Sequence, residues 1–354
     1  MEQNGGATGP RWAVGGRGEC PVSGQVVVVT GASGGIGRAT AVAFARRGDR
    51  VALLARGEKG LAAAADEVRA VGGTALVLPV DVADAAAVDD AADRVEAELG
   101  PIDVWVNVAF TAVFAPFADI TAAEYARVTE VTYLGVVHGT MAALSRMRPR
   151  DRGVIVQTGS ALGRRGVPLQ SAYCGAKHAV KGFTEALHTE LKGQSSNVHV
   201  TRVDLPGVNT PQFDWVLNKM PKTPQPVAPI YAPELMAAAL VHAAEHPTRR
   251  AWWVGLPTVY TVLGNEVWPQ FMDWYLARTG KDGQLTGVDA SPDDPSNLWE
   301  PADGPDGRDF GAEGRFSDQQ WTRDPQIWAS RHHGALAAAG AAGLAGLAVL
   351  RRRR

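Results

Sequence analysis

The sequence alternates between short runs of β-branched or aliphatic residues and longer alanine-rich stretches, from residue 24 to about residue 256. The short runs are almost continuously apolar, which is typical of strands that helices cover on both faces. This pattern predicts an α/β fold, a Rossmann-like doubly wound parallel sheet with helices on both faces. The predicted strands lie at residues 25–30, 50–55, 75–80, 102–107, 153–157, 198–203 and 252–254.

The overall composition excludes several classes of protein. The chain has 354 residues, 45% of them hydrophobic, which is enough for a large core. Its formal net charge of −2 gives no basis for nucleic-acid binding. Two cysteines, Cys20 and Cys174, are too few for a disulfide framework, so we expect a reducing, cytoplasmic environment. No His/Cys spacing indicates a metal site.

A glycine-rich turn, Thr30-Gly31-Ala32-Ser33-Gly34-Gly35-Ile36-Gly37, directly follows the first predicted strand and opens a helix. A pyrophosphate needs backbone N–H groups and the positive end of a helix dipole close by. Side chains at the turn would hold the phosphates away. Because this turn lies between a buried strand and a helix, it predicts a dinucleotide-binding site.

The second predicted strand ends at Ala55-Arg56, where enzymes that bind NAD usually place an acidic residue. A guanidinium here suits the 2′-phosphate of NADP, so we expect NADP(H) rather than NAD(H). The alternative is that Arg56 is only a solvated loop residue. Asp81, after the third strand, either accepts a hydrogen bond from the adenine amino group or caps the helix that begins near Asp84.

Three residues with the chemistry for proton transfer follow the fifth predicted strand. Ser160 comes just after the strand, and Tyr173 and Lys177 are four residues apart, so that they share one face of a helix. A nearby ammonium group would lower the tyrosine pKa toward neutrality. Tyr173 could then exchange a proton with a carbonyl or alcohol oxygen that Ser160 holds.

These motifs, in this order, resemble those of the short-chain dehydrogenase/reductase family, of the type with a Thr-Gly-x-x-x-Gly-x-Gly turn and a Tyr-x-x-x-Lys pair. The resemblance runs from about Val22 to about Gly255 and implies an oxidoreductase that uses NAD(P) on carbonyl and alcohol groups. It also implies a homodimer or homotetramer and a contact of Lys177 with the nicotinamide ribose. The cofactor-binding residues that it and the turn imply are Thr30, Gly31, Ser33, Gly35, Ile36, Gly37, Arg56, Asp81, Val82, Asn107, Ala109, Tyr173, Lys177, Pro206, Gly207, Val208 and Thr210.

The sequence departs from the family pattern at two positions. Phe110 stands where a glycine normally borders the cofactor cleft, and it either shapes the substrate pocket or belongs to the core. Thr132 stands where the family has a catalytic asparagine that helps hold a water near the lysine. Threonine can donate and accept hydrogen bonds but is shorter, so the proton relay is expected to be altered.

The ends of the chain differ in composition from its centre. We expect a flexible arm at residues 1–22, the Rossmann-type catalytic domain at 23–280 and an irregular Pro/Asp/Gly-rich extension at 281–330, held by Trp299, Trp321 and Trp328. Within the domain, residues 211–231 are rich in proline and aromatic residues, which indicates a lid over an apolar substrate pocket. Residues 331–354 form an apolar Ala/Gly-rich tail, in which residues 334–350 carry no charge and four arginines follow. This tail is a candidate for a marginal membrane anchor, an interfacial helix or a helix–helix contact.

The sequence thus predicts an NADP(H)-dependent oxidoreductase acting on a small, apolar carbonyl or alcohol compound, with Tyr173 as general acid and base. The alternative is a nucleotide-binding scaffold or redox sensor that keeps the fold without efficient turnover, and Phe110 and Thr132 are the residues that favour it.

Overall fold

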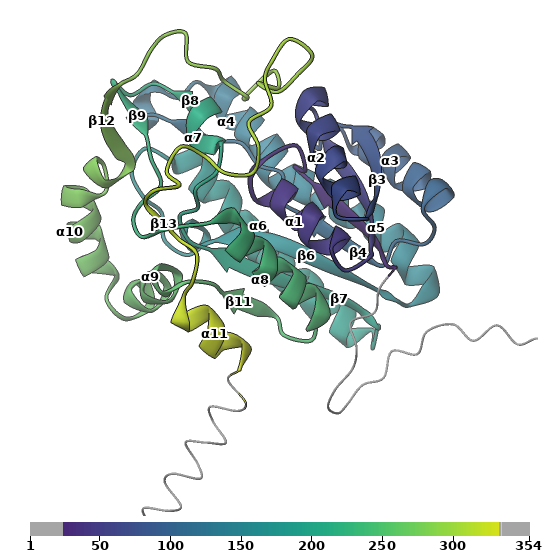
Figure 1. Ribbon diagram of the computed structural model, residues 1–354. Coiled ribbons are helices and arrows are strands. Elements are labelled where there is room, and N and C mark those ends of the chain that lie inside the picture. The colour runs from purple at the N-terminus through teal and green to yellow at the C-terminus, as the bar shows by residue number, and fades with distance from the viewer. Residues whose placement is uncertain (1–23, 333, 335–354) are drawn as a thin grey trace, which may run out of the picture.

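A seven-stranded parallel sheet forms the centre of the molecule (Figure 1). The computed structural model describes residues 24–332 and 334. The strand order is β11-β7-β6-β4-β1-β2-β3, and every neighbouring pair is parallel. This confirms the predicted fold class and all seven expected strands. The strands are β1 (Val26–Thr30), β2 (Arg50–Ala55), β3 (Thr74–Pro79), β4 (Val104–Asn107), β6 (Gly153–Ser160), β7 (Val198–Leu205) and β11 (Ala251–Trp253).

Helices cover both faces of the sheet because successive residues of each strand point to opposite sides. In β1, Val27 and Val29 pack into one hydrophobic cluster and Val26 and Val28 into the other. The first face is covered by α1 (Gly35–Ala45), α2 (Glu58–Ala70) and α8 (Pro233–Glu245). The second is covered by α3 (Ala85–Glu98), α5 (Gly135–Met147) and α6 (Ser171–Gly193).

Side chains fix the ends of several helices. Asp84 accepts hydrogen bonds from the N–H groups of Ala86 and Ala87 and so caps α3. Thr121 and Glu124 form a reciprocal capping box at the start of α4 (Ala122–Thr129). Between α4 and α5 lies one π-helical turn, Glu130–Leu134, a feature often found at functional sites.

The direction of winding reverses at β1, which has β4 on one side and β2 on the other. At such a point the connections leave to opposite faces and open a crevice at the carboxyl ends of the strands. The segments that follow β1, β2, β4, β6 and β7 therefore meet at one edge of the sheet.

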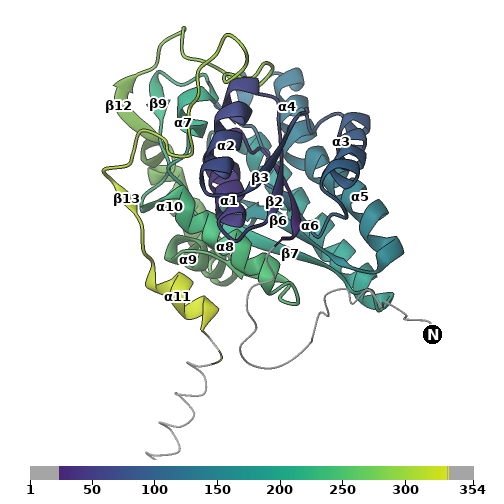
Figure 2. The same cartoon turned by 45° about the vertical axis from the view of Figure 1, so that its right-hand side comes forward.

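A smaller layer of short elements lies over this edge (Figure 2). Two-stranded sheets join β5 to β8, β9 to β12 and β10 to β13. The expected extension at 281–330 is largely irregular, with short strands and one short helix. The remaining elements of the described residues, inside and outside this extension, are β5 (Val113–Phe114), α7 (Gln212–Trp215), β8 (Leu217–Asn218), β9 (Lys222–Pro224), β10 (Ile230–Tyr231), α9 (Leu256–Val267), α10 (Pro269–Thr279), β12 (Leu285–Asp289), β13 (Gln320–Trp321) and α11 (Pro325–Arg331), with 3-10 turns at Phe117–Asp119, Arg148–Arg150, Ala161–Gly163 and Asp282–Gln284.

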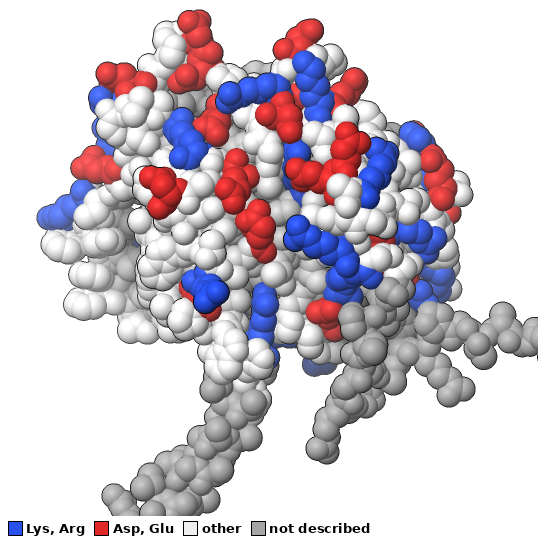
Figure 3. Space-filling model, viewed as in Figure 1, with Lys and Arg blue, Asp and Glu red and all other residues white. Residues whose placement is uncertain are grey.

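Residues 1–23, 333 and 335–354 lie outside the described residues, and with them the predicted N-terminal arm and almost all of the tail predicted to contact a membrane. Within the described ranges, no helix is both long enough and apolar enough to cross a membrane. Basic and acidic side chains are interspersed on the face shown in Figure 3, which agrees with the near-neutral net charge.

Candidate active site

The glycine-rich turn packs so closely that side chains at two positions would collide with the backbone. Gly31 has a φ of +69°, and a Cβ there would lie 2.8 Å from Cα of Ala109. A Cβ on Gly37 would lie 2.1 Å from the carbonyl oxygen of Gly31. The Thr30 hydroxyl accepts hydrogen bonds from the N–H groups of Val108 and Ala109, at 3.0 and 3.2 Å. The turn is therefore locked against the end of β4 and leaves a cradle in which a backbone can approach a phosphate.

A groove runs along this turn and across the ends of β2, β3 and β4. Most of the predicted cofactor residues line it, so the structure brings them together from several elements. They are Gly31, Ser33, Gly35, Ile36, Gly37, Arg56, Asp81, Val82, Ala109 and Thr210. The open space in the groove is about 110 Å³. It is smaller than the sites of drug-sized ligands, which usually occupy roughly 300 Å³ or more.

Asn107 does not line this groove. Its side chain is buried and donates to Gln157 Oε1 at 2.9 Å, while its own oxygen accepts from Trp105 Nε1 at 2.9 Å. These bonds tie β4 to β6 and satisfy a buried amide. The structure therefore assigns Asn107 a role in holding the sheet end, rather than a direct place in the groove.

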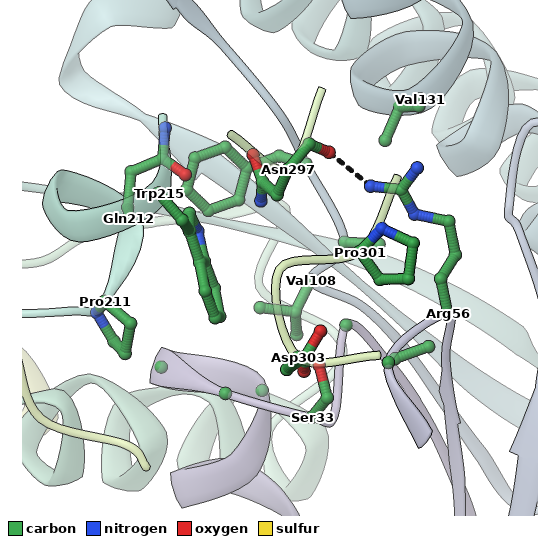
Figure 4. A pocket seen from close by; sticks show the side chains of 18 of the residues that line it. Ser33, Arg56, Val108, Val131, Pro211, Gln212, Trp215, Asn297, Pro301 and Asp303 are labelled. Atoms are coloured by element: carbon green, nitrogen blue, oxygen red, sulfur yellow. Dashed lines mark hydrogen bonds between the residues drawn. The ribbon is translucent and has the colours of Figure 1, made fainter. Parts of the chain in front are cut away.

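Arg56 and Asp81 face the groove but already have protein partners. Arg56 donates to the carbonyl oxygen of Trp299 at 2.6 Å and to that of Asn297, and its guanidinium lies 3.9 Å from Asp81 (Figure 4). Arg56 is thus not a solvated loop residue. Asp81 accepts from the N–H of Ala83 at 2.9 Å and pairs with Arg127.

The helix cap expected of Asp81 is instead provided by Asp84. Burial of Asp81 would raise the pKa of its carboxyl, but the Ala83 N–H and the charge of Arg127 outweigh that effect and lower it. The carboxylate is therefore ionised at neutral pH and available as an acceptor at the rim of the groove.

Ser160, Tyr173 and Lys177 line a second, larger cavity that adjoins the groove. Ser160 ends β6, and the other two lie on the first turns of α6. Tyr173 and Ser160 line the same wall of this cavity, Ser160 is near enough to lower the pKa of the tyrosine, and Ser160 Oγ accepts from the N–H of Leu162 at 3.1 Å. Lys177 donates to the carbonyl oxygen of Thr158 at 2.8 Å. A substrate oxygen beside Tyr173 would therefore also reach Ser160.

Burial dominates the titration of this group. Desolvation raises the pKa of Tyr173 above its ordinary value, against the hydrogen bond from Ser160. Desolvation also lowers the pKa of Lys177 to about 8, against the nearby carboxylate of Asp204. The ammonium group of Lys177 donates to the Thr158 carbonyl and lies 5.7 Å from the Tyr173 ring centroid, and the lowering of the tyrosine pKa by Lys177 and a bound nicotinamide stays a prediction.

The two residues that depart from the family pattern have clear positions. Phe110 lines both the groove and the cavity, and it is only half-buried, so it shapes the pocket rather than the core. Thr132 is fully buried in the π-helical turn. Its hydroxyl donates to the carbonyl oxygen of Thr111 at 2.8 Å and accepts from the N–H of the same residue at 3.0 Å. The Thr132 hydroxyl therefore uses its donor hydrogen and an acceptor lone pair to hold the backbone of Thr111.

The large cavity, with a volume of about 380 Å³, is lined mainly by apolar side chains. Pro206, Gly207, Val208 and Thr210 form one wall, which brings this predicted cofactor segment next to the Ser–Tyr–Lys group. Part of the predicted lid at 211–231 contributes as well. The remaining apolar wall comes from α9 and α10, which the sequence did not assign to the pocket; its residues include Pro257, Tyr260, Met272, Tyr275 and Leu276.

Residues 296–311 of the extension lie against the groove, and we refer to them as the strap. Asn297, Pro301 and Asp303 of the strap line the groove together with Trp215 from α7. Sequence reasoning missed the strap because it has no periodic pattern and contacts residues some 240 positions earlier. Trp215 of α7 lies inside the predicted lid at 211–231, and its aromatic side chain was the only sign in the sequence that it could line a pocket.

One group on α8 has the residue types of a metal site. His242, Glu245 and His246 place potential ligand atoms within 4.8 Å of one another, far from the groove in sequence and on another part of the fold. Glu245 is already paired with Arg47. Burial first, and then the charges of His246 and Arg331, lower the pKa of His242 to about 4, so this imidazole is neutral at pH 7.

Comparison with known proteins agrees with this geometry. The family description "short chain dehydrogenase" matches residues 25–220. An uncharacterized oxidoreductase of Bacillus subtilis (strain 168) is 31% identical over 278 residues, 78% of each chain. A 3-dehydrosphinganine reductase of Danio rerio is 36% identical over 197 residues, 54% of this chain and 59% of that protein. The chain belongs to the short-chain dehydrogenase family and is an oxidoreductase of the class that acts on CH–OH and C=O groups.

Solved structures show the same fold. A short-chain dehydrogenase/reductase of Burkholderia phymatum in complex with NAD is similar with a TM-score of 0.63 and 25% identity, over 73% of this chain and 96% of that one. A short-chain type dehydrogenase/reductase of Mycobacterium marinum is similar with a TM-score of 0.58 and 27% identity, over 66% of this chain and 94% of that one.

Proposed function

We propose that this chain catalyses reversible hydride transfer between NADP(H) and a carbonyl or alcohol compound, with Tyr173 as general acid and base. The main support is that Ser160, Tyr173 and Lys177 line one cavity, which adjoins the glycine-rich groove. A bound nicotinamide would supply or accept the hydride.

The residues around the groove fit such a cofactor. Gly31 and Gly37 let the turn pack against backbone that a Cβ would strike, and the N-terminus of α1 lies beside this turn. Arg56 and Asp81 lie at the opposite end of the groove, where they could hold an adenosine ribose and its base. The guanidinium of Arg56 favours a 2′-phosphate, which is the basis for NADP(H).

The proton chemistry follows from the side chains. Tyr173 is protonated near neutral pH, so it can donate its proton to a carbonyl oxygen that becomes an alkoxide. Ser160 would donate a second hydrogen bond to the same oxygen. Lys177, with a pKa near 8, changes charge close to physiological pH, and its charge would stabilise the phenolate that remains.

The cavity favours an apolar substrate of moderate size. Its volume of about 380 Å³ and its wall of proline, aromatic and aliphatic side chains suit a hydrophobic carbonyl compound. The Danio rerio relative and the 3-ketodihydrosphingosine reductase of Bos taurus are both named as reductases of keto compounds. A homodimer or homotetramer remains a prediction from the family.

The test is Tyr173→Phe in the full-length protein, assayed with NADPH and a panel of apolar ketones. We expect turnover to fall by at least about 100-fold while NADPH affinity changes less than about threefold, because only the acid/base hydroxyl is removed. If the wild-type protein binds NADPH but turns over no substrate of the panel, the nucleotide-binding scaffold becomes the better description. Equal turnover by wild type and variant would exclude Tyr173 as the acid.

A further inference from the structure

The strap is fastened over the groove by backbone hydrogen bonds at its middle and at its C-terminal end. The N–H of Lys59, on the first turn of α2, donates to the carbonyl oxygen of Asp303 at 3.1 Å. The N–H of Gly35, at the start of α1, donates to that of Gly311 at 3.1 Å. The strap therefore occupies one N–H group at each of the two helix N-termini that border the site, those of α1 and α2 (both helices are labelled in Figure 1).

One side chain of the strap points into the site itself. Asp303 is only 5% exposed, and a Cβ added to Gly57 or Gly60 would lie 1.8 or 2.2 Å from its carboxylate oxygens. One oxygen, Oδ2, is buried without any hydrogen-bond partner. In Figure 4 the same side chain lies beside Ser33. A buried, partnerless carboxylate oxygen is costly, so its retention calls for a reason.

The surroundings of Asp303 are those of an anion site. Gly57 precedes the first turn of α2, whose N-terminal N–H groups and dipole favour negative charge. Gly57 and Gly60 lack side chains at the two positions that the carboxylate touches. Burial lowers the pKa of Arg56 here, and the carboxylates of Asp81 and Asp303 oppose that change, so Arg56 and Asp303 are electrostatic neighbours.

We propose that Asp303 is a determinant of cofactor choice, because its carboxylate occupies the position that a cofactor 2′-phosphate would take beside Arg56 and the N-terminus of α2. The inference rests on the proposed function. A ribose 2′-hydroxyl can lie next to Oδ2 and donate a hydrogen bond to it. A 2′-phosphate is repelled by the same group. Arg56 favours NADPH and Asp303 opposes it, so selectivity is set by their balance.

The test measures binding rather than turnover. The affinities of the full-length protein for NADPH and NADH are compared in wild type, Asp303→Asn and Asp306→Asn, where Asp306 is an exposed carboxylate on the same strap. Asp303→Asn keeps the shape but removes the charge. We expect the ratio of NADPH to NADH affinity to rise about tenfold or more in this variant, since a buried like charge is removed. In Asp306→Asn the ratio should stay within about twofold, because an exposed charge is screened by solvent.

Further outcomes separate this inference from the proposed function. An unchanged ratio in Asp303→Asn, or an equal gain for both cofactors, would overturn the inference alone. Binding of neither cofactor by wild type or Asp303→Asn would overturn the proposed function and the inference with it. Asp303→Ala serves as a second variant if the asparagine variant unfolds, and the same rise in the ratio is expected. Adenosine 2′,5′-bisphosphate and 5′-ADP, which carry equal numbers of phosphates, repeat the comparison without the nicotinamide.

Discussion

The ring of Phe110 packs edge-on against that of Tyr173, with their centroids 5.6 Å apart, and the ammonium group of Lys177 lies 5.6 Å from the first ring and 5.7 Å from the second. A residue that the family pattern has as glycine thus contacts the proposed acid and its lysine. Phe110 lines both the groove and the substrate cavity, so its ring lies where the two adjoin.

Replacing Phe110 with alanine should loosen this contact. We expect the free energy of unfolding to fall by about 1–2 kcal/mol, less than for a fully buried phenylalanine, because the ring is half-buried. We also expect kcat to fall several-fold, since Tyr173 loses a neighbour that orients it. Urea unfolding and steady-state kinetics measure both. Phe117→Ala, at a ring that is 71% exposed, is the matched control and should leave both unchanged; an equal effect of the two substitutions would contradict a specific role for Phe110.

Thr132→Val should destabilise the protein. Valine has nearly the same shape, but it leaves the N–H and carbonyl of Thr111 without their partner. We expect a loss of about 1–3 kcal/mol in the free energy of unfolding, since a buried backbone group without a hydrogen bond is costly. Thr189→Val is the control, because Thr189 is exposed and bonds only within its own helix. A fully stable Thr132→Val protein would show that water replaces the hydroxyl.

The buried ammonium of Lys177 should make stability depend on pH. Desolvation lowers the pKa of Lys177 to about 8 in the folded state, from 10.5. Between these values the unfolded chain binds more protons, so the free energy of unfolding contributed by this group rises with pH by roughly 3 kcal/mol in total. Below pH 8 this contribution of Lys177 to the free energy of unfolding is absent.

Lys177→Met removes the titrating group and should remove this rise. Urea unfolding of wild type and variant at pH 7, 8, 9 and 10 measures it as a difference, in which the other titrating groups cancel. The difference in the free energy of unfolding, variant minus wild type, should be larger at pH 7 than at pH 10. Parallel curves would mean that Lys177 has an ordinary pKa in the folded protein.

Arg38 holds the strap to the first two helices. Its guanidinium is almost fully buried, donates to Glu67 at 2.8 Å and also pairs with Asp309 of the strap. We expect Asp309→Asn to increase the rate of tryptic cleavage at the exposed Arg308 roughly fivefold, because local opening of the strap becomes easier. Asp318→Asn, an exposed residue beyond the strap, should leave the rate unchanged. Equal rates in all three proteins would show that Arg38 does not anchor the strap.

The sequence by itself determined the sheet and the local motifs. The inner strands are mostly apolar and buried on both faces, while the edge strands β3 and β11 are partly exposed. The glycine turn and the Tyr–Lys pair depend only on neighbours within one turn. All seven strands were therefore predicted, as was the meeting of the segments after β1, β2 and β7. The same local reasoning could not predict that Asn107 bonds to Gln157 or that Asp81 pairs with Arg127, because these partners lie about 50 residues away.

Only the tertiary structure decided what faces the groove from outside. The strap has no periodic pattern, and its contacts with Gly57 and Arg56 span some 240 residues, so nothing in its composition predicted them. The burial of Tyr173 and Lys177 was equally invisible, although it sets the direction of both pKa changes. Local patterns follow from backbone geometry and side-chain size, whereas desolvation and charge pairing depend on which distant segments the folded chain brings together.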